Sequence, residues 1–81
     1  MIQYVVITNR GKKYHHFFPN KREAEMFLMK ESLKVQIAKE NAQEFLDNLP
    51  TDWSREYLDY YIEKAKERLT WQEPKLLVLR V

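Results

Sequence analysis

The chain has 81 residues, and 14 lysines and arginines against 12 aspartates and glutamates give a formal net charge of +2. This length suits one domain, near the lower limit for a core without covalent staples. The absence of cysteine excludes disulfides and thiolate metal clusters. No segment approaches the ~20 apolar residues of a membrane span, and there is no signal-peptide pattern. We therefore expect a soluble, cytoplasmic protein with no membrane partner.

Residues 1–19 are predicted to form a β-hairpin. The segment 2–8 is rich in β-branched and aromatic side chains, and Asn9-Arg10-Gly11 is typical of a three-residue hairpin loop. With Thr8 opposite Lys12, strand alternation directs one set of side chains to the core: Ile2, Tyr4, Val6, Tyr14, His16 and Phe18. His15 then points outward, so the adjacent histidines face opposite sides and are not expected to bind one metal ion.

Residues 20–49 are predicted to form a helix, either continuous or broken. Asn20 followed by Glu23 has the spacing of a capping box. An apolar stripe follows at heptad spacing, formed by Leu28, Val35, Ala42 and Leu49. Glu31 interrupts this stripe. A continuous helix would be longer than the strands, whereas a second capping-box spacing allows a break near residues 39–41.

A second helix is expected over residues 54–70 and a final strand over residues 75–81. The helix has a stripe for burial, formed by Leu58, Ile62, Ala65 and Leu69. The order ββααβ predicts an α+β fold, with a three-stranded mixed or antiparallel sheet and two main helices packed on one face. We expect the first strand in the centre. Two antiparallel helices between the strands predict a last strand parallel to the first.

An acidic face is predicted on the second helix, opposite its apolar stripe. It consists of Glu56, Asp59, Tyr60, Glu63 and Glu67. Such a face is either a solvated helix surface or a docking surface for a basic partner. The partner could be a protein that normally grips nucleic acid.

An additional apolar stripe lies on the first helix, almost opposite the heptad stripe. Its members are Met26, Met29, Leu33 and Ile37. One alternative buries one stripe against the sheet and the other against the second helix. In the other alternative, the methionines form an adaptable surface for a partner or for a second copy of the chain.

The hairpin and the residues after it carry an excess of positive charge. The candidate nucleic-acid contacts are Arg10, Lys12, Lys13, His15, Lys21 and Arg22. Cations beside aromatic side chains bind single strands by neutralising phosphates and stacking on bases. Hairpin tips are polar in most proteins, however, and no known nucleic-acid-binding motif accompanies this cluster.

The sequence contains no catalytic, cofactor or metal signature. With a single glycine it has no glycine-rich phosphate loop, and neither serine has the context of a nucleophile. The leading hypothesis is therefore a small non-enzymatic protein–protein interaction module without cofactors, comparable to a phage-type regulator or inhibitor of a host protein. The alternatives are a nucleic-acid-binding module and a structural subunit that self-associates, for instance as a homodimer.

Overall fold

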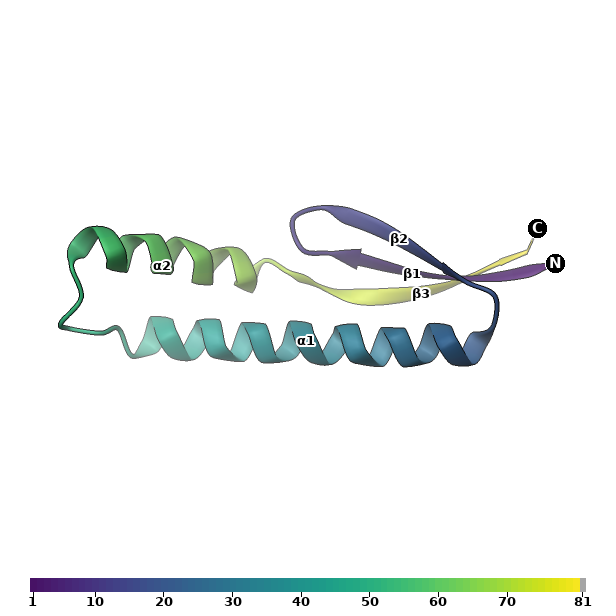
Figure 1. The fold of residues 1–81 in the computed structure, drawn as a ribbon, viewed down its shortest axis with the longest axis horizontal. Coiled ribbons are helices and arrows are strands. Elements are labelled where there is room, and N and C mark those ends of the chain that lie inside the picture. The colour runs from purple at the N-terminus through teal and green to yellow at the C-terminus, as the bar shows by residue number, and fades with distance from the viewer. Residues whose placement is uncertain (81) are drawn as a thin grey trace.

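The computed structural model describes residues 1–80 and confirms the α+β class and the ββααβ order (Figure 1). The elements are β1 (Ile2–Asn9), β2 (Lys13–Phe18), α1 (Lys21–Asp47), α2 (Arg55–Leu69) and β3 (Gln72–Arg80). β3 begins three residues earlier than expected and includes Pro74, which an edge strand tolerates. Val81, which the sequence assigned to the last strand, lies outside the described residues.

The three strands form one antiparallel sheet in the order β2-β1-β3. The central position of β1 is confirmed, but the expectation that the last strand runs parallel to it is wrong. The helices explain the direction of β3. α2 returns along α1 but ends before it reaches the sheet, so the chain enters β3 from the hairpin-loop end and runs opposite to β1 (Figure 1).

α1 is the scaffold that joins the sheet to α2. It is continuous from Lys21 to Asp47, so of the two predicted alternatives the unbroken helix is the one formed. Asn20 caps it, and its side chain accepts a hydrogen bond from the Glu23 N–H at 2.9 Å. Twenty-seven residues span about 40 Å, whereas the eight residues of β1 span about 27 Å. The C-terminal part of α1 therefore extends past the sheet.

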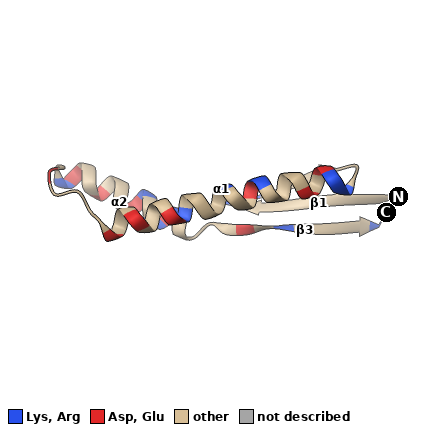
Figure 2. Ribbon diagram, turned by 90° about the horizontal axis from the view of Figure 1, so that it is seen from below, with Lys and Arg blue, Asp and Glu red and all other residues tan. Residues whose placement is uncertain are grey.

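α2 packs on this overhang of α1 and does not cover the sheet. Within the described residues, α2 contacts α1 alone among the regular elements. Figure 2 shows α2 beyond the hairpin-loop end of the strands, with α1 lying alongside both. The expectation of two helices on one sheet face is thus correct for α1 and needs correction for α2. The sheet packs on the buried face of α1 along the N-terminal part of the helix, and α2 packs on the same face along the C-terminal part.

The three-residue loop of the hairpin begins one residue later than predicted. Thr8 pairs with Tyr14, and Asn9 pairs with Lys13, which leaves residues 10–12 as the loop. The Asn9 Oδ1 accepts a hydrogen bond from the Gly11 N–H, and Gly11 has φ +93°, a conformation that glycine adopts without strain. The shift moves each partner by two residues, so every side chain keeps its predicted face.

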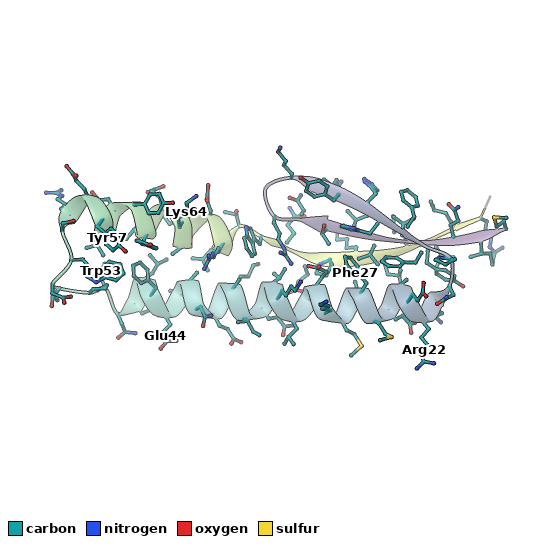
Figure 3. All side chains as sticks on the ribbon, viewed as in Figure 1. Arg22, Phe27, Glu44, Trp53, Tyr57 and Lys64 are labelled. Atoms are coloured by element: carbon teal, nitrogen blue, oxygen red, sulfur yellow. The ribbon has the colours of Figure 1, made fainter. Side chains whose placement is uncertain are left out.

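The core is thin and consists of small side chains. The buried residues are Val5, Val6, Ala24, Val35, Ala42 and Ala65. Phe27 lies between α1 and the sheet (Figure 3), with its ring centroid 4.7 Å from His16 and 5.2 Å from Phe18. His16 and Phe18 thus face α1, as predicted.

Three residues depart from the predicted core. Ile2 and Tyr14 belong to the predicted core face but are 46% and 56% exposed, since they lie near the two ends of the hairpin. Val5 is on the opposite face but is buried, because Phe17 and Leu77 flank it on the neighbouring strands. Lateral neighbours on the central strand therefore bury a side chain that no helix covers.

The overall shape is strongly elongated. The extents are 57 × 18 × 12 Å and the radius of gyration is 16.7 Å. A compact chain of 81 residues has a radius of gyration of about 12 Å. The overhang of α1 causes this elongation, because it places α2 in line with the sheet instead of on top of it.

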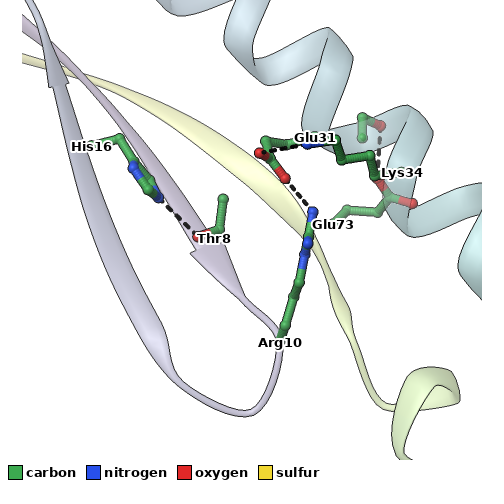
Figure 4. Close-up of polar contacts among 7 residues, drawn as sticks. Thr8, Arg10, His16, Glu31, Lys34 and Glu73 are labelled. Atoms are coloured by element: carbon green, nitrogen blue, oxygen red, sulfur yellow. Dashed lines mark hydrogen bonds and ion pairs between the residues drawn. The ribbon is translucent and has the colours of Figure 1, made fainter.

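A set of polar contacts fixes the hairpin loop and the start of β3 to the middle of α1 (Figure 4). Arg10 forms an ion pair with Glu31, whose side chain is only 13% exposed, and its guanidinium lies 5.1 Å from the centre of the Trp71 ring. The Ser32 hydroxyl donates to Glu73 at 2.8 Å. We call these five residues the polar clamp. The clamp explains why a glutamate interrupts the apolar stripe of α1.

We predict that Arg10 and Glu31 are energetically coupled. A double-mutant cycle of Arg10→Gln and Glu31→Gln, based on free energies of unfolding, should give a coupling energy of about 1 kcal/mol, because this pair is partly buried. The exposed pair Lys21–Glu25 provides the matched control, with an expected coupling of about 0.3 kcal/mol. Urea unfolding of the variants measures both values. Equal coupling in the two cycles would contradict the structural role of Arg10.

Candidate functional site: the acidic arm

The part of the molecule beyond the sheet carries most of the negative charge. We call residues 40–69, which comprise the end of α1, the connecting loop and α2, the arm. The arm has eight acidic residues and four basic ones, whereas the remainder of the chain has four acidic and ten basic residues. Acidic segments appear on both helices of the arm in Figure 2. The molecule is therefore electrically polar along its longest axis.

The predicted acidic face of α2 is exposed throughout, and its two halves differ. In the second half, Glu63 pairs with Lys66 at 3.6 Å and Glu67 pairs with Lys64 at 3.8 Å. These contacts compensate the two carboxylates locally.

The first half of the acidic face is not compensated. Glu56 and Asp59 form no ion pair within residues 1–80, and both are exposed. Tyr60 beside them is 57% exposed, and the Lys64 ammonium lies 5.5 Å from its ring centre. Because no ion pair engages Glu56 or Asp59 within residues 1–80, this half of the acidic face is the one more open to a basic partner.

An aromatic cluster closes the end of the arm. Trp53, Tyr57 and Tyr61 lie at successive intervals of four residues, and their rings meet edge to face at centroid distances between 4.9 and 5.5 Å. Phe45 joins them from α1, 5.8 Å from Trp53. Trp53 and Tyr57 were not among the sequence-based candidates, although their spacing is the signal that could have indicated them.

The cluster is packed but not fully covered. Trp53, Tyr57 and Tyr61 are 36%, 50% and 38% exposed, respectively. Figure 3 shows Trp53 and Tyr57 between the two helices at the loop end. Next to the cluster a groove runs between α1 and α2, lined in part by Phe45, Tyr60 and Tyr61. The arm thus combines exposed aromatic surface with unpaired carboxylates.

The apolar stripe on α1 is left uncovered. Met26, Met29, Leu33 and Ile37 are all exposed, since the sheet and α2 both pack on the opposite face of the helix. The alternative in which the sheet takes one stripe and α2 takes the other is therefore wrong. The stripe remains available for a partner.

The structure separates the basic residues proposed as nucleic-acid contacts. Arg10 is held in the polar clamp, and Lys21 pairs with Glu25 at 3.7 Å. Lys12 and Lys13 lie at the hairpin loop, whereas Lys21 and Arg22 lie at the far end of the hairpin. The six positions therefore do not form one patch.

The two histidines have different environments, as strand alternation predicts. His16 faces α1, and its Nε2 lies 3.1 Å from the Thr8 hydroxyl oxygen. His15 is exposed on the other face of the sheet. Within residues 1–80, no group of three or more metal-ligating side chains comes together.

The outer face of the sheet is a further uncovered surface. Phe17, Leu77 and Leu79 are 61%, 46% and 40% exposed there, with Lys13 and Lys75 at one end. The leucines of β3 were not among the candidates, because the sequence did not determine which face of the last strand the helices cover.

Comparison with known proteins gives no relative for this chain. No family model matches it, and searches of curated proteins and of solved structures also yield no match. Within the described residues, no helix is both long enough and apolar enough to cross a membrane. The geometry of the arm and of the uncovered surfaces therefore carries the functional argument.

We predict that Tyr61 controls the ionisation of Tyr57. The Tyr57 hydroxyl donates to the Tyr61 hydroxyl at 3.4 Å. This hydrogen bond raises the pKa of Tyr57, and electrostatic interaction with Tyr61 and partial burial add to the effect. Tyr61→Phe should therefore lower the pKa of Tyr57 toward its ordinary value, as measured by NMR titration of the ring carbon that bears the hydroxyl.

Tyr60→Phe is the matched control for this titration. The Tyr60 ring packs 5.2 Å from the Tyr61 ring, but no hydrogen bond joins the Tyr60 hydroxyl to the Tyr57–Tyr61 pair within residues 1–80. This variant should leave the Tyr57 pKa unchanged. An unchanged Tyr57 pKa in Tyr61→Phe would show that the two hydroxyls are not bonded in solution.

Proposed function

We propose that the protein is a non-enzymatic protein-binding module that presents its acidic arm to a basic surface of another protein. The observation that carries this proposal is the exposed, uncompensated pair Glu56 and Asp59 on α2, beside the exposed Tyr60. Unpaired surface carboxylates accelerate encounter with a basic partner and determine its orientation.

The aromatic residues of the arm support a protein as the partner. Binding energy at protein interfaces is concentrated in tyrosine, tryptophan and arginine side chains. Tyr60 and the exposed parts of Trp53 and Tyr57 provide such side chains next to the carboxylates. A basic partner could place arginine or lysine side chains against both the rings and the carboxylates, and both contacts are favourable.

The spacing of the carboxylates supports a partner that also binds nucleic acid. Glu56, Asp59 and Glu63 follow one another at intervals of three and four residues, which corresponds to about 5 Å along a helix. Such a row of regularly spaced negative charges can occupy a basic groove that otherwise holds phosphates. The arm would then act by occlusion, or would recruit the partner without blocking it.

Nucleic-acid binding by the hairpin has less structural support. Of the loop cations, Arg10 is engaged in the polar clamp, which leaves Lys12 and Lys13. Lys75 lies at the same end of the sheet, on the opposite edge strand. Three lysines without a surrounding motif provide few phosphate contacts, so any such binding should be weak and strongly salt-dependent.

The partner can be captured through Tyr60. Photo-crosslinking from a Tyr60→benzoylphenylalanine variant should join a protein to the arm, which mass spectrometry then identifies. For that protein in purified form, Glu56→Gln/Asp59→Asn should weaken binding about tenfold, because two attractions are lost. Calorimetry at low salt measures the change, and a nucleic-acid oligonucleotide should compete for the same partner surface.

A variant with an equal change of net charge provides the control. Glu23→Gln/Glu25→Gln removes two exposed carboxylates from the start of α1, at the sheet end, and should leave the affinity nearly unchanged. Equal weakening by both variants would contradict a specific role of the arm. Salt-dependent binding of a labelled oligonucleotide to the protein itself, lost in Lys12→Gln/Lys13→Gln, would favour the nucleic-acid alternative instead.

A further inference from the structure

The uncovered face of α1 is apolar at its centre. Met26, Met29, Leu33 and Ile37 are 62%, 72%, 56% and 48% exposed, respectively. At 100° per residue they lie within one arc directly opposite Ala24, Val35 and Ala42, the buried residues of the helix. The sheet and α2 both occupy that opposite side, so no other helix or strand within residues 1–80 covers these four residues.

The same face carries opposite charges at its two ends. Arg22 precedes the apolar stripe, and Glu40 and Glu44 follow it at helical spacing. Figure 3 shows Arg22 and Glu44 projecting from the side of α1 that faces away from the sheet and α2. Within residues 1–80 none of the three side chains forms an ion pair. The face is thus basic, apolar and acidic in order along the helix.

This order is symmetric about Leu33. Met29 and Ile37 lie four residues from Leu33 on either side, and Arg22 and Glu44 lie eleven residues from it, close to three helical turns. A second α1 laid antiparallel with Leu33 at the centre would therefore place Met29 against Ile37 and Arg22 against Glu44. Each of these two contacts then occurs twice between the copies, because a two-fold axis repeats every contact.

We propose that this face binds a second copy of the chain in an antiparallel α1–α1 contact, with the two-fold axis at Leu33. Apolar side chains fill the centre, and two Arg22–Glu44 ion pairs between the copies fix the register at its ends. Side chains at intervals of three and four residues form the ridges that pack antiparallel helices. Beside Leu33 and Met29, a groove that also involves Leu28, Ser32 and Gln36 can receive side chains of the second copy.

The surface area of the single chain is consistent with a missing contact. Its accessible surface is 6465 Å² at a mass of 10.0 kDa. A compact monomer of this mass exposes about 5,200 Å². The excess is about 1,200 Å², whereas one partner in a standard specific interface loses about 800 Å². Among the described residues the buried ones are few and no larger than valine, so a second copy on this face would add apolar packing that the single chain does not have.

The outer face of the sheet is less suited to a second copy. It is apolar through Phe17, Leu77 and Leu79, and Lys13, Lys75 and Glu73 lie at its end. The Glu73 carboxylate already accepts a hydrogen bond from Ser32. Two such faces therefore bring more lysines than free carboxylates to the contact. Charge complementarity therefore selects the face of α1.

The proposed dimer is independent of the protein-binding function of the arm. The acidic face of α2 points away from α1, so Glu56 and Asp59 remain exposed when two α1 helices meet. An antiparallel arrangement places the two arms at opposite ends of the assembly. Partner binding and dimerisation can therefore be tested with separate variants.

Sedimentation equilibrium of charge-exchange variants tests the contact. Arg22→Glu and Glu44→Arg should each weaken dimerisation about tenfold, since each creates two like-charge contacts. The combined Arg22→Glu/Glu44→Arg variant restores both ion pairs with exchanged signs and should dimerise within about threefold of the wild-type affinity. Leu33→Asp should remain monomeric with nearly unchanged helix content by circular dichroism, because the Leu33 side chain is more than half exposed in the single chain.

Cysteine crosslinking tests the position of the axis. The chain has no cysteine, so a single introduced thiol reports one position. Leu33→Cys should crosslink efficiently to a second copy with a short thiol reagent, and Phe17→Cys on the outer sheet face should not. A mass that stays monomeric at all concentrations, a combined charge variant no better than the single ones, or crosslinking through Phe17→Cys alone would overturn the proposal.

Discussion

The length of α1 relative to the sheet determines the rest of this structure. A helix of about 40 Å beside strands of about 27 Å leaves several turns without a sheet to cover. α2 packs on those turns, and its return path ends at the hairpin-loop edge of the sheet. β3 must then run antiparallel to β1. The elongated shape, the direction of the last strand and the separate acidic arm therefore have one cause.

The polar clamp lies at the junction between the sheet and the arm. There the sheet ends, α2 has just ended, and the hairpin loop, β3 and the middle of α1 meet (Figure 4). The charge-assisted contact of Arg10 with Glu31 and the hydrogen bond from Ser32 to Glu73 hold the parts of this junction together. Arg10, which the sequence suggested as a nucleic-acid contact, thus has a structural role.

Local signals in the sequence predicted the helices and strands. The strand direction and the contacts between elements depend on longer-range packing, which these signals do not contain. The Asn20 cap and the alternation of the hairpin were sufficient for α1 and for the faces of β1 and β2, because a register shift of two residues preserves each face. The direction of β3 depended on where α2 ends relative to the sheet, which helical periodicity does not specify. The acidic face of α2 followed from helical periodicity. The four-residue spacing of Trp53 and Tyr57 was a local signal, but the contribution of Phe45 depended on the α1–α2 contact, which periodicity alone does not reveal.

The separation of charge along the molecule gives its two proposed contacts different physical requirements. On α2, uncompensated carboxylates need a basic surface that the chain does not present as one patch, since its own cations are dispersed or paired. On α1, Arg22 and Glu44 flank an apolar centre in a self-complementary order, so a second copy supplies what the face lacks. Salt should weaken the first contact strongly, because it rests on charge. It should weaken the second less, because the apolar centre of that contact is not screened.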